Sequence, residues 1–260
     1  MFRSLHIAAT GMVAQETQLD TISNNLANAN TVGYKRQETE FEDLLYQNVR
    51  SSGPNAAGAV APTGTQVGSG SRVVATSRFF AQGPLQQTGN PLDLAIEGSG
   101  FIAVTKSTGG VAYTRAGQLK LDGQGRLVTS DGLQVEPPIT VPADASKVTI
   151  ATDGTVSATQ HGQAAAATLG QLQLVNFANP GGLDAIGHNL FEATGASGEP
   201  ATGAPGTEGR GTIMQGALEG SNVEVVNEMV GLIRAQRAYE INSKVIAAAD
   251  EMMRNATQMQ

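Results

Sequence analysis

Apolar residues recur with helical spacing at both ends of the chain. Near the start, with Ile22 at a half-step, one face carries a residue every seven positions: Leu5, Met12, Leu19 and Leu26. Near the other end a second stripe, broken at Arg237, comprises Val226, Val230, Ile233, Ile241, Val245 and Met252. These patterns predict two long amphipathic helices, the first with a coiled-coil-like seam. Neither stripe has an evident partner of sufficient size in the chain, so we expect both stripes to be covered by further partners.

Both predicted helices have recognisable ends. The first runs into the Asn-rich segment 24–30, where amide side chains compete with the helical backbone, before Gly33 offers a left-handed stop. The amides of Asn24 and Asn28 fit a second interpretation equally well, because a polar residue at a helix interface specifies its register. Directly before the second stripe, Ser221 and Glu224 predict a capping box at the helix start.

The middle of the chain has a period of two. Leu92, Leu94 and Ile96 alternate with polar or small residues, which predicts a strand with Asp93 and Glu97 on its solvated face. Similar short runs follow. Three Asp-Gly pairs, beginning at residues 122, 131 and 153, favour hairpin turns in which both central residues take positive φ.

Two segments before these strands are less regular. Residues 51–71 are rich in Gly, Ser and Ala and lack a core pattern, which predicts an extended arm. Residues 37–50 fit either a short helix or an extended segment.

These patterns predict an α+β protein with four parts. Long terminal α-helices form a coiled-coil-like inner domain, and the middle forms a mainly antiparallel β domain preceded by an extended arm. The expected divisions are residues 1–30 for the first helix, 31–71 for the connecting segment and arm, 72–220 for the outer β domain, and 221–260 for the second helix.

Composition and charge argue against several classes of partner and site. The 260 residues carry a net charge of −7 with no run of Lys or Arg, which argues against binding to nucleic acid or to anionic membranes. There is no cysteine, so thiolate metal sites and cysteine nucleophiles are excluded. The first residues contain no uninterrupted apolar stretch typical of a cleaved signal peptide, and no segment has 18 consecutive apolar residues.

No catalytic, cofactor or metal site is predicted. His6, His161 and His188 are far apart in the sequence, and none has a ligand at metal-binding spacing. The sequence contains no nucleophile elbow, phosphate-binding loop or dinucleotide fingerprint. A hydrolase built on the β domain therefore has no supporting residues.

Three motifs carry a resemblance to a known family. The segment 23–35, SNNLANANTVGYK, resembles the signature of the bacterial flagellar rod, hook and hook-associated axial proteins. Residues 219–226 and 235–244 are similar to the C-terminal end of that family, and residues 113–117 and 131–132 to its central β domain. The motif residues are Asn24, Asn25, Asn28, Asn30, Gly33, Tyr34, Ser221, Asn222, Gln236, Arg237 and Tyr239.

The chain length and the arm resemble most the distal-rod type. The resemblance implies a structural subunit of a rigid helical tube that transmits torque from motor to hook and encloses the export channel. The implied partners are further copies, the proximal rod proteins, the hook protein, the peptidoglycan and outer-membrane rings and the flagellar export apparatus. The implied location is the basal body across the periplasm, reached without a cleaved signal.

Two alternatives remain open from the sequence. The chain fits another axial protein of the same family, from the hook or the proximal rod. From a different class, it fits a surface binding protein whose helices serve only to oligomerise it.

Overall fold

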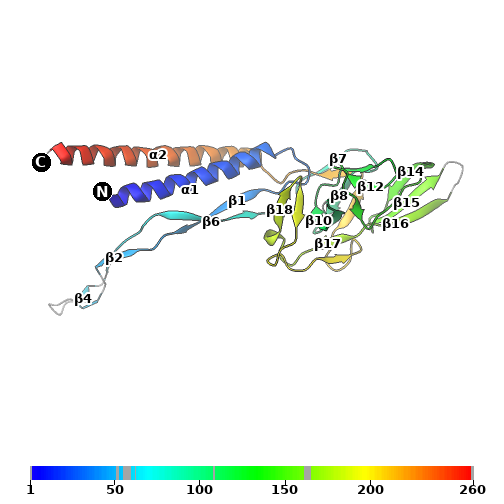
Figure 1. The fold of residues 1–260 in the computed structure, drawn as a ribbon, viewed down its shortest axis with the longest axis horizontal. Coiled ribbons are helices and arrows are strands. Elements are labelled where there is room, and N and C mark those ends of the chain that lie inside the picture. Colours follow the sequence, from blue (N-terminus) through cyan, green and yellow to red (C-terminus); the bar gives the residue numbers. More distant parts are fainter. Residues whose placement is uncertain are drawn as a thin grey trace. The chain divides into compact units, whose positions relative to one another are not determined.

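The computed structural model describes residues 2–50, 53–54, 60–61, 63–107, 109–160 and 165–258. Its contacts divide the chain into two compact units (Figure 1). The helical unit comprises Met1–Ala27, Gln37–Arg78 and Glu224–Gln260, and the β body comprises Asn28–Arg36 and Phe79–Val223. These units group residues 28–36 with the β body and residues 72–78 with the helices, and the division expected for the assembled protein stays a prediction.

Both terminal stripes lie on helices. Helix α1 spans Phe2–Ala27 and ends inside the Asn-rich segment, and helix α2 spans Val225–Gln258. The expected capping box is wrong, because α2 begins one turn after Ser221, whose hydroxyl accepts the amide hydrogen of Val223 (3.2 Å) instead. Glu224 stands directly before the helix, and its carbonyl accepts the amide hydrogen of Glu228 (3.1 Å), as expected of an N-cap residue.

The two helices run side by side and pack through small and polar residues (Figure 1). Gly11 faces Asn242, and a Cβ atom at Gly11 would stand 3.0 Å from Asn242 Nδ2. Gly231 faces Ile22, where the corresponding distance to Cδ1 is 3.3 Å. Ala235 is buried on the same side of α2 as Gly231. Small residues allow close approach of helix axes, so α2 uses this face within the chain.

A two-stranded antiparallel ribbon completes the helical unit and packs on α1. It pairs β1 (Gln37–Asp43) with β6 (Ser71–Arg78), so residues 37–43 are extended rather than helical. Beyond the ribbon, β2 (Gln47–Arg50) pairs with β5 (Thr65–Val67), and β3 (Gly53–Pro54) pairs with β4 (Val60–Ala61). Residues 51–52, 55–59 and 62 of the predicted arm lie outside the described residues.

The β body is mainly antiparallel, as predicted. Its largest sheet has the order β18-β19-β10-β9-β17-β20, with β13 also pairing β9. The strands of this sheet are β9 (Phe101–Thr105), β10 (Val111–Thr114), β13 (Val135–Glu136), β17 (Leu174–Asn176), β18 (Asp184–Gly187), β19 (Leu190–Glu192) and β20 (Ala201–Gly203). A short 3₁₀-helix, Pro180–Gly182, precedes β18.

The β body also contains smaller sheets. One has three strands, β14 (Ala145–Ile150), β15 (Thr155–Gln160) and β16 (Ala166–Gln171). The remaining pairs are β7 (Leu85–Gln87) with β22 (Ala217–Glu219), β8 (Leu94–Glu97) with β21 (Thr212–Gln215), and β11 (Leu119–Leu121) with β12 (Leu127–Thr129).

The Asp-Gly pairs lie in turns, but the expected turn type is wrong. Gly132 and Gly154 have φ values of 81° and 83°, whereas the aspartates before them do not take positive φ. At the first pair, positive φ falls on Gly125. The reason is that the Asp122 carboxylate accepts backbone amide hydrogens from within a longer loop.

The β body has two hydrophobic clusters. The larger contains Leu94, Val104, Leu127 and Leu174 among its fully buried members. The second is aromatic, with neighbouring rings packed edge to face at centroid distances of 4.9 to 5.9 Å, and its rings are Phe80, Phe101, Tyr113, Phe177 and Phe191.

Asp93 corrects the prediction of a solvated strand face. Its carboxylate is buried and accepts hydrogen bonds from Thr88 Oγ1 (2.6 Å) and Asn90 Nδ2 (3.0 Å). Ala95 is also buried, and only Glu97 is exposed as expected. Strand β8 is covered on both faces, so alternation along it does not separate core from solvent.

The packed face of α2 makes a first prediction. Ala235→Asp places an uncompensated charge against α1 and should lower the free energy of unfolding of the helical unit by about 3 kcal/mol or more. Ser243→Asp, at an exposed position of the same helix, should change it by less than about 0.5 kcal/mol. Thermal unfolding followed by far-ultraviolet circular dichroism measures both. Equal effects of the two variants would contradict the assigned packing.

Candidate functional site

A carboxylate is buried inside the β body. Glu219, the last residue of β22, has a side chain that is 1% exposed. Its Oε1 atom lies 2.6 Å from Lys35 Nζ, and its Oε2 atom lies 2.6 Å from Arg115 Nε. Lys35 and Arg115 are buried as well. These three residues, the ion cluster, come from distant parts of the sequence.

Backbone groups complete the ion cluster. The amide of Gly83 donates to Glu219 Oε1 (2.9 Å), and Lys35 Nζ donates to the carbonyl of Ala81 (2.8 Å). The Arg115 guanidinium donates to carbonyls of the β8–β9 turn. Among the described residues, no buried side-chain nitrogen or oxygen lacks a hydrogen-bond partner. The buried charges are therefore compensated, as charges in an interior must be.

Burial and pairing have opposite effects on the Glu219 carboxyl. Burial alone would raise its pKa, but the charge of Arg115 and the hydrogen bonds from Lys35 and Arg115 outweigh burial, and the pKa is lowered. For Lys35, burial lowers the pKa of the ammonium more than the attraction of Glu219 raises it. Glu219 is consequently ionised at neutral pH.

Segment 28–36 reaches the ion cluster through a tight turn. The amide of Thr31 donates to the carbonyl of Asn28 (3.1 Å), and the amide of Gly33 donates to the carbonyl of Glu219 (2.9 Å). Gly33 has a φ of 71°, and a Cβ atom there would stand 2.8 Å from the backbone nitrogen of Ala116. Only glycine satisfies both the positive φ and the close backbone approach.

Asn222 joins the residues next to three of the four places where the chain passes between the units. These three places follow residues 36, 78 and 223, and the fourth follows residue 27. Asn222 Oδ1 accepts the amide hydrogen of Arg36 (2.7 Å), and Nδ2 donates to the carbonyls of Phe79 (2.8 Å) and Ala81 (3.1 Å). The guanidinium of Arg36 also lies 5.2 Å from the centroid of the Phe79 ring. One amide side chain thus contacts the β-body ends of three of the four connections.

The Asn-rich segment has two roles. Asn28 belongs to the turn after α1, in agreement with helix termination. The amide buried among other elements is that of Asn25, which donates to the carbonyl of Gln37 (2.8 Å) and to Glu228 Oε2 (3.2 Å). Asn24 and Asn30 are exposed. Asn25 therefore links α1, β1 and α2 inside the helical unit.

The remaining motif residues are dispersed. Ser221 is buried and Tyr34 is half-buried in the β body. Gln236, Arg237 and Tyr239 are exposed on α2, where Arg237 forms an ion pair with Glu240 (3.0 Å). Ser221 and Tyr34 thus belong to the β body, and Gln236, Arg237 and Tyr239 belong to the helical unit.

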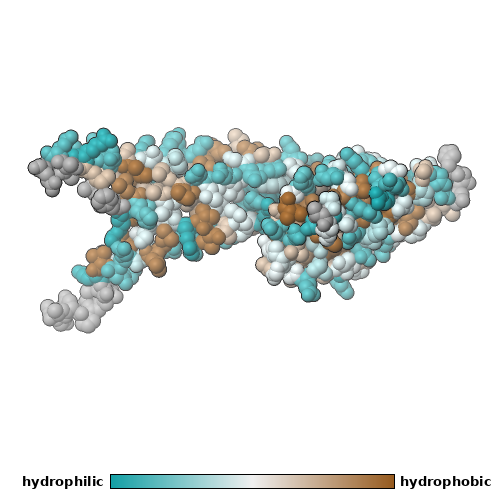
Figure 2. All heavy atoms as spheres, in the orientation of Figure 1, coloured by the Kyte–Doolittle hydropathy of each residue, from teal (hydrophilic) through white to brown (hydrophobic). Residues whose placement is uncertain are grey.

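The apolar residues expected at an interface on α2 all lie on its exposed side. The exposed fraction ranges from 41% at Val230 to 68% at Val226, and the set comprises Val226, Val230, Ile233, Ile241, Val245 and Met252. On α1, Ile22 is buried and Leu5, Met12, Leu19 and Leu26 are half-buried. Figure 2 shows hydrophobic side chains in patches along the helices. The single chain leaves the large apolar side chains of α2 uncovered.

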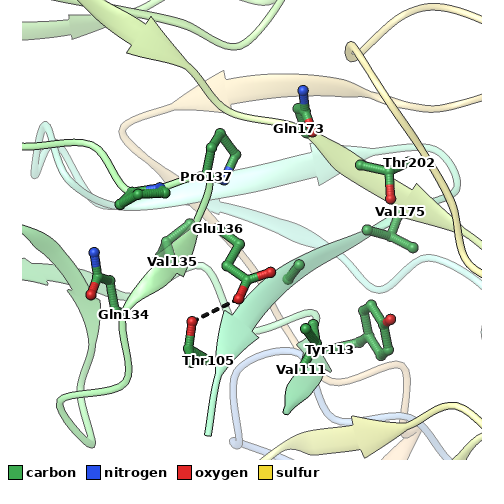
Figure 3. Close-up of a pocket in the computed structure, with 12 residues that line it drawn as sticks. Thr105, Val111, Tyr113, Gln134, Val135, Glu136, Pro137, Gln173, Val175 and Thr202 are labelled. Atoms are coloured by element: carbon green, nitrogen blue, oxygen red, sulfur yellow. Dashed lines mark hydrogen bonds between the residues drawn. The ribbon is translucent and has the colours of Figure 1, made fainter. Parts of the chain in front are cut away.

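A shallow groove of about 450 Å³ crosses the large sheet beside the aromatic cluster (Figure 3). Its lining includes Tyr113, Gln173 and Glu136, and Glu136 Oε1 accepts a hydrogen bond from Thr105 Oγ1 (2.8 Å). The groove thus places one hydroxyl, that of Thr105, against one carboxylate, that of Glu136.

Other candidate chemistry is sparse. His6 and His188 are exposed, and His161 lies outside the described residues. In the described part of the chain, no group of three or more His, Cys, Asp or Glu side chains is placed to hold a metal ion. None of the described helices is long and apolar enough to cross a membrane.

Sequence reasoning missed the ion cluster, although a signal was present. Lys35, Arg115 and Glu219 each lie inside one of the three family motifs, and each is charged in an otherwise mostly uncharged run. Charges at these positions are read as solvated unless the fold is known, because pattern alone does not show which distant residues meet.

Comparisons with known proteins identify the chain's relatives. Three family models match: the flagella basal body rod protein over residues 5–35, the flagellar hook protein FlgE/F/G D1 domain over 95–158, and the flagellar basal body rod FlgEFG protein C-terminal over 214–259. The flagellar basal-body rod protein FlgG of Caulobacter vibrioides is 48% identical over 99% of both chains. Those of Borreliella burgdorferi and Bacillus subtilis are 46% and 40% identical, each over 97% of both chains.

The chain belongs to the flagellar basal-body rod protein family. The resemblance expected from the three motifs is thereby confirmed. Each matched region of this basal-body rod protein contains one member of the ion cluster: Lys35, Arg115 and Glu219. The three regions that define the family along the sequence therefore meet at one buried carboxylate.

Gly33 supplies the second prediction. Gly33→Ala combines positive φ with a backbone collision and should lower the free energy of unfolding of the β body by about 3 kcal/mol or more. Gly89→Ala is the matched control, because Gly89 has a φ of 72° but no other atom lies within 4 Å of the place that a Cβ atom would take. It should cost only about 1 kcal/mol. Denaturant unfolding of both variants measures the difference, and equal costs would refute the close approach.

Proposed function

We propose that this chain is a structural subunit of the flagellar distal rod. Copies assemble through their helical units into a rigid helical tube that transmits torque to the hook and encloses the export channel. The observation that carries this proposal is the row of large apolar side chains on the exposed side of α2, opposite the small-residue face packed on α1. A monomeric protein rarely leaves such a row in water.

The energetics favour assembly. Full burial of a Val, Ile or Met side chain stabilises by about 1.5–3 kcal/mol. Burial of the exposed parts of six such side chains, each roughly half exposed, against neighbouring copies therefore favours assembly by on the order of 5 kcal/mol per subunit. A heterologous contact of this kind, repeated along a helix, generates an open tube. The coiled-coil-like seam of α1 contributes to the same inner layer.

Further partners follow from the family. We infer that the tube joins proximal rod proteins at one end and the hook protein at the other, inside the peptidoglycan and outer-membrane rings. The subunit reaches the periplasm through the flagellar export apparatus, and it has no catalytic role. The two ends of the chain, residues 1–30 and the last turns of residues 223–260, fray in the unassembled subunit and order on polymerisation.

The third prediction tests the exposed row on α2. Ile241→Asp should abolish tube formation while leaving the folded subunit unchanged, because Ile241 is 60% exposed in the single chain. Negative-stain microscopy of concentrated protein measures tubes, and circular dichroism measures the fold.

Ser243→Asp is the control for this test. Residues two apart on a helix point about 200° away from each other, so Ser243→Asp adds the same charge on a different side. It should leave tubes intact. Normal tubes from Ile241→Asp would refute the proposed interface, and short stalks from the parent chain would favour an oligomerised surface binding protein.

The fourth prediction concerns the arm. We propose that residues 51–71 lie along neighbouring subunits and oppose axial sliding, because so long a segment without a core is unusual unless it is functional. Removal of residues 54–68 should leave the β body folded and tubes assembled but lower their bending stiffness. The persistence length of the tubes, measured by electron microscopy, tests this expected loss of stiffness. Tubes as stiff as those of the parent chain would make the arm a linker only.

A further inference from the structure

Glu219 stands beside three of the four chain connections between the β body and the helical unit. Its side chain binds Lys35, one residue before the connection that follows residue 36, and the amide of Gly83, shortly after the connection that follows residue 78. Glu219 itself lies in the strand that leads to the connection that follows residue 223. On its other side the carboxylate binds Arg115, which is fixed by carbonyls of the β8–β9 turn.

Because the ion cluster is buried, solvent cannot compensate for the loss of one of its members. The Lys35 and Glu219 side chains are 0% and 1% exposed, so water cannot replace a lost partner without opening the surrounding backbone. A buried pair that loses one member leaves an uncompensated charge, which is strongly destabilising. By contrast, Lys106 and Glu192 form a 2.9 Å ion pair in the same unit with side chains 20% and 46% exposed. That pair is also a Lys–Glu ion pair, but solvent can reach both of its side chains.

We propose that Glu219 is a positioning residue that anchors three of the four chain connections to the β body, so that torque entering through the helices reaches the body without loosening it. This role rests on the proposed function as a rod subunit. It assigns a mechanical task to an ion cluster that neither binds a ligand nor catalyses a reaction.

The anchor is also sensitive to acid. The ionisable groups that face the Glu219 carboxylate in the described residues are Lys35 and Arg115. The pKa of Glu219 is lowered on folding, so its contribution to stability is complete above its unfolded-state value of about 4.5 and is lost as the pH falls through the folded-state value. Acid therefore weakens this anchor.

Amide hydrogen exchange in the unassembled Ile241→Asp background tests the anchor. Glu219→Gln should raise the exchange rates of the Gly33 and Gly83 amides at least tenfold at neutral pH, with the Val104 amide of the core unchanged. In the parent, the same two amides should lose protection, corrected for intrinsic exchange, below about pH 4.5. This acid step should be absent from Glu219→Gln.

Glu192→Gln is the matched control, and it should change those rates by less than twofold. If Glu219→Gln fails to fold, Lys35→Met, which keeps the Arg115 pair, is measured in its stead. Unchanged exchange at Gly33 and Gly83, or equal acceleration at Val104, would overturn the anchor.

The role of Glu219 in torque transmission is tested on assembled tubes of chains that retain Ile241. Glu219→Gln tubes should form, because the proposed interface is untouched, but the variance of twist along each tube in cryo-electron microscopy should be at least twice that of the parent. Equal variance would overturn the role in torque transmission. Failure of the parent itself to form tubes would instead overturn the proposed function, while the exchange result would still decide whether Glu219 anchors the connections.

Discussion

The β body depends on the buried carboxylate of Glu219. A carboxylate is stable away from water only if cations and donors surround it, and Glu219 obtains these from Lys35, Arg115 and the amide of Gly83. Each partner belongs to a different stretch of chain. Satisfying one charge therefore forces segment 28–36, the strand before Arg115 and the strand leading to α2 into one place.

The same requirement explains the composition of the family motifs. Gly33 is needed because the chain passes against the backbone at Ala116 on its way to the cluster. Asn222 is needed because three connections meet and offer one amide hydrogen and two carbonyls that must be satisfied. Gly33, which looks like a helix-ending signal in the sequence, is thus required by the approach of its segment to the ion cluster.

The helical unit follows a different principle. Small residues of α2, such as Gly231 and Ala235, make the close contact with α1. Large apolar residues of α2, such as Ile233 and Ile241, are exposed. A helix that only needed to stabilise its own chain would turn the larger residues inward, because burial scales with apolar area. The distribution suits a subunit whose main stabilisation comes from other copies.

Local pattern alone determined the two helices, the mainly antiparallel β domain and the family, because helical and strand periods and turn residues act over a few neighbouring positions. It also placed the apolar stripe of α2 correctly on one face. It did not determine which face of α2 packs on α1, because Gly and Ala carry little hydrophobic signal. Nor did it distinguish Asp93, which is buried, from Glu97, which is exposed. The ion cluster was decided only by the tertiary structure, since Glu219 meets Lys35 and Arg115 across 184 and 104 residues of chain.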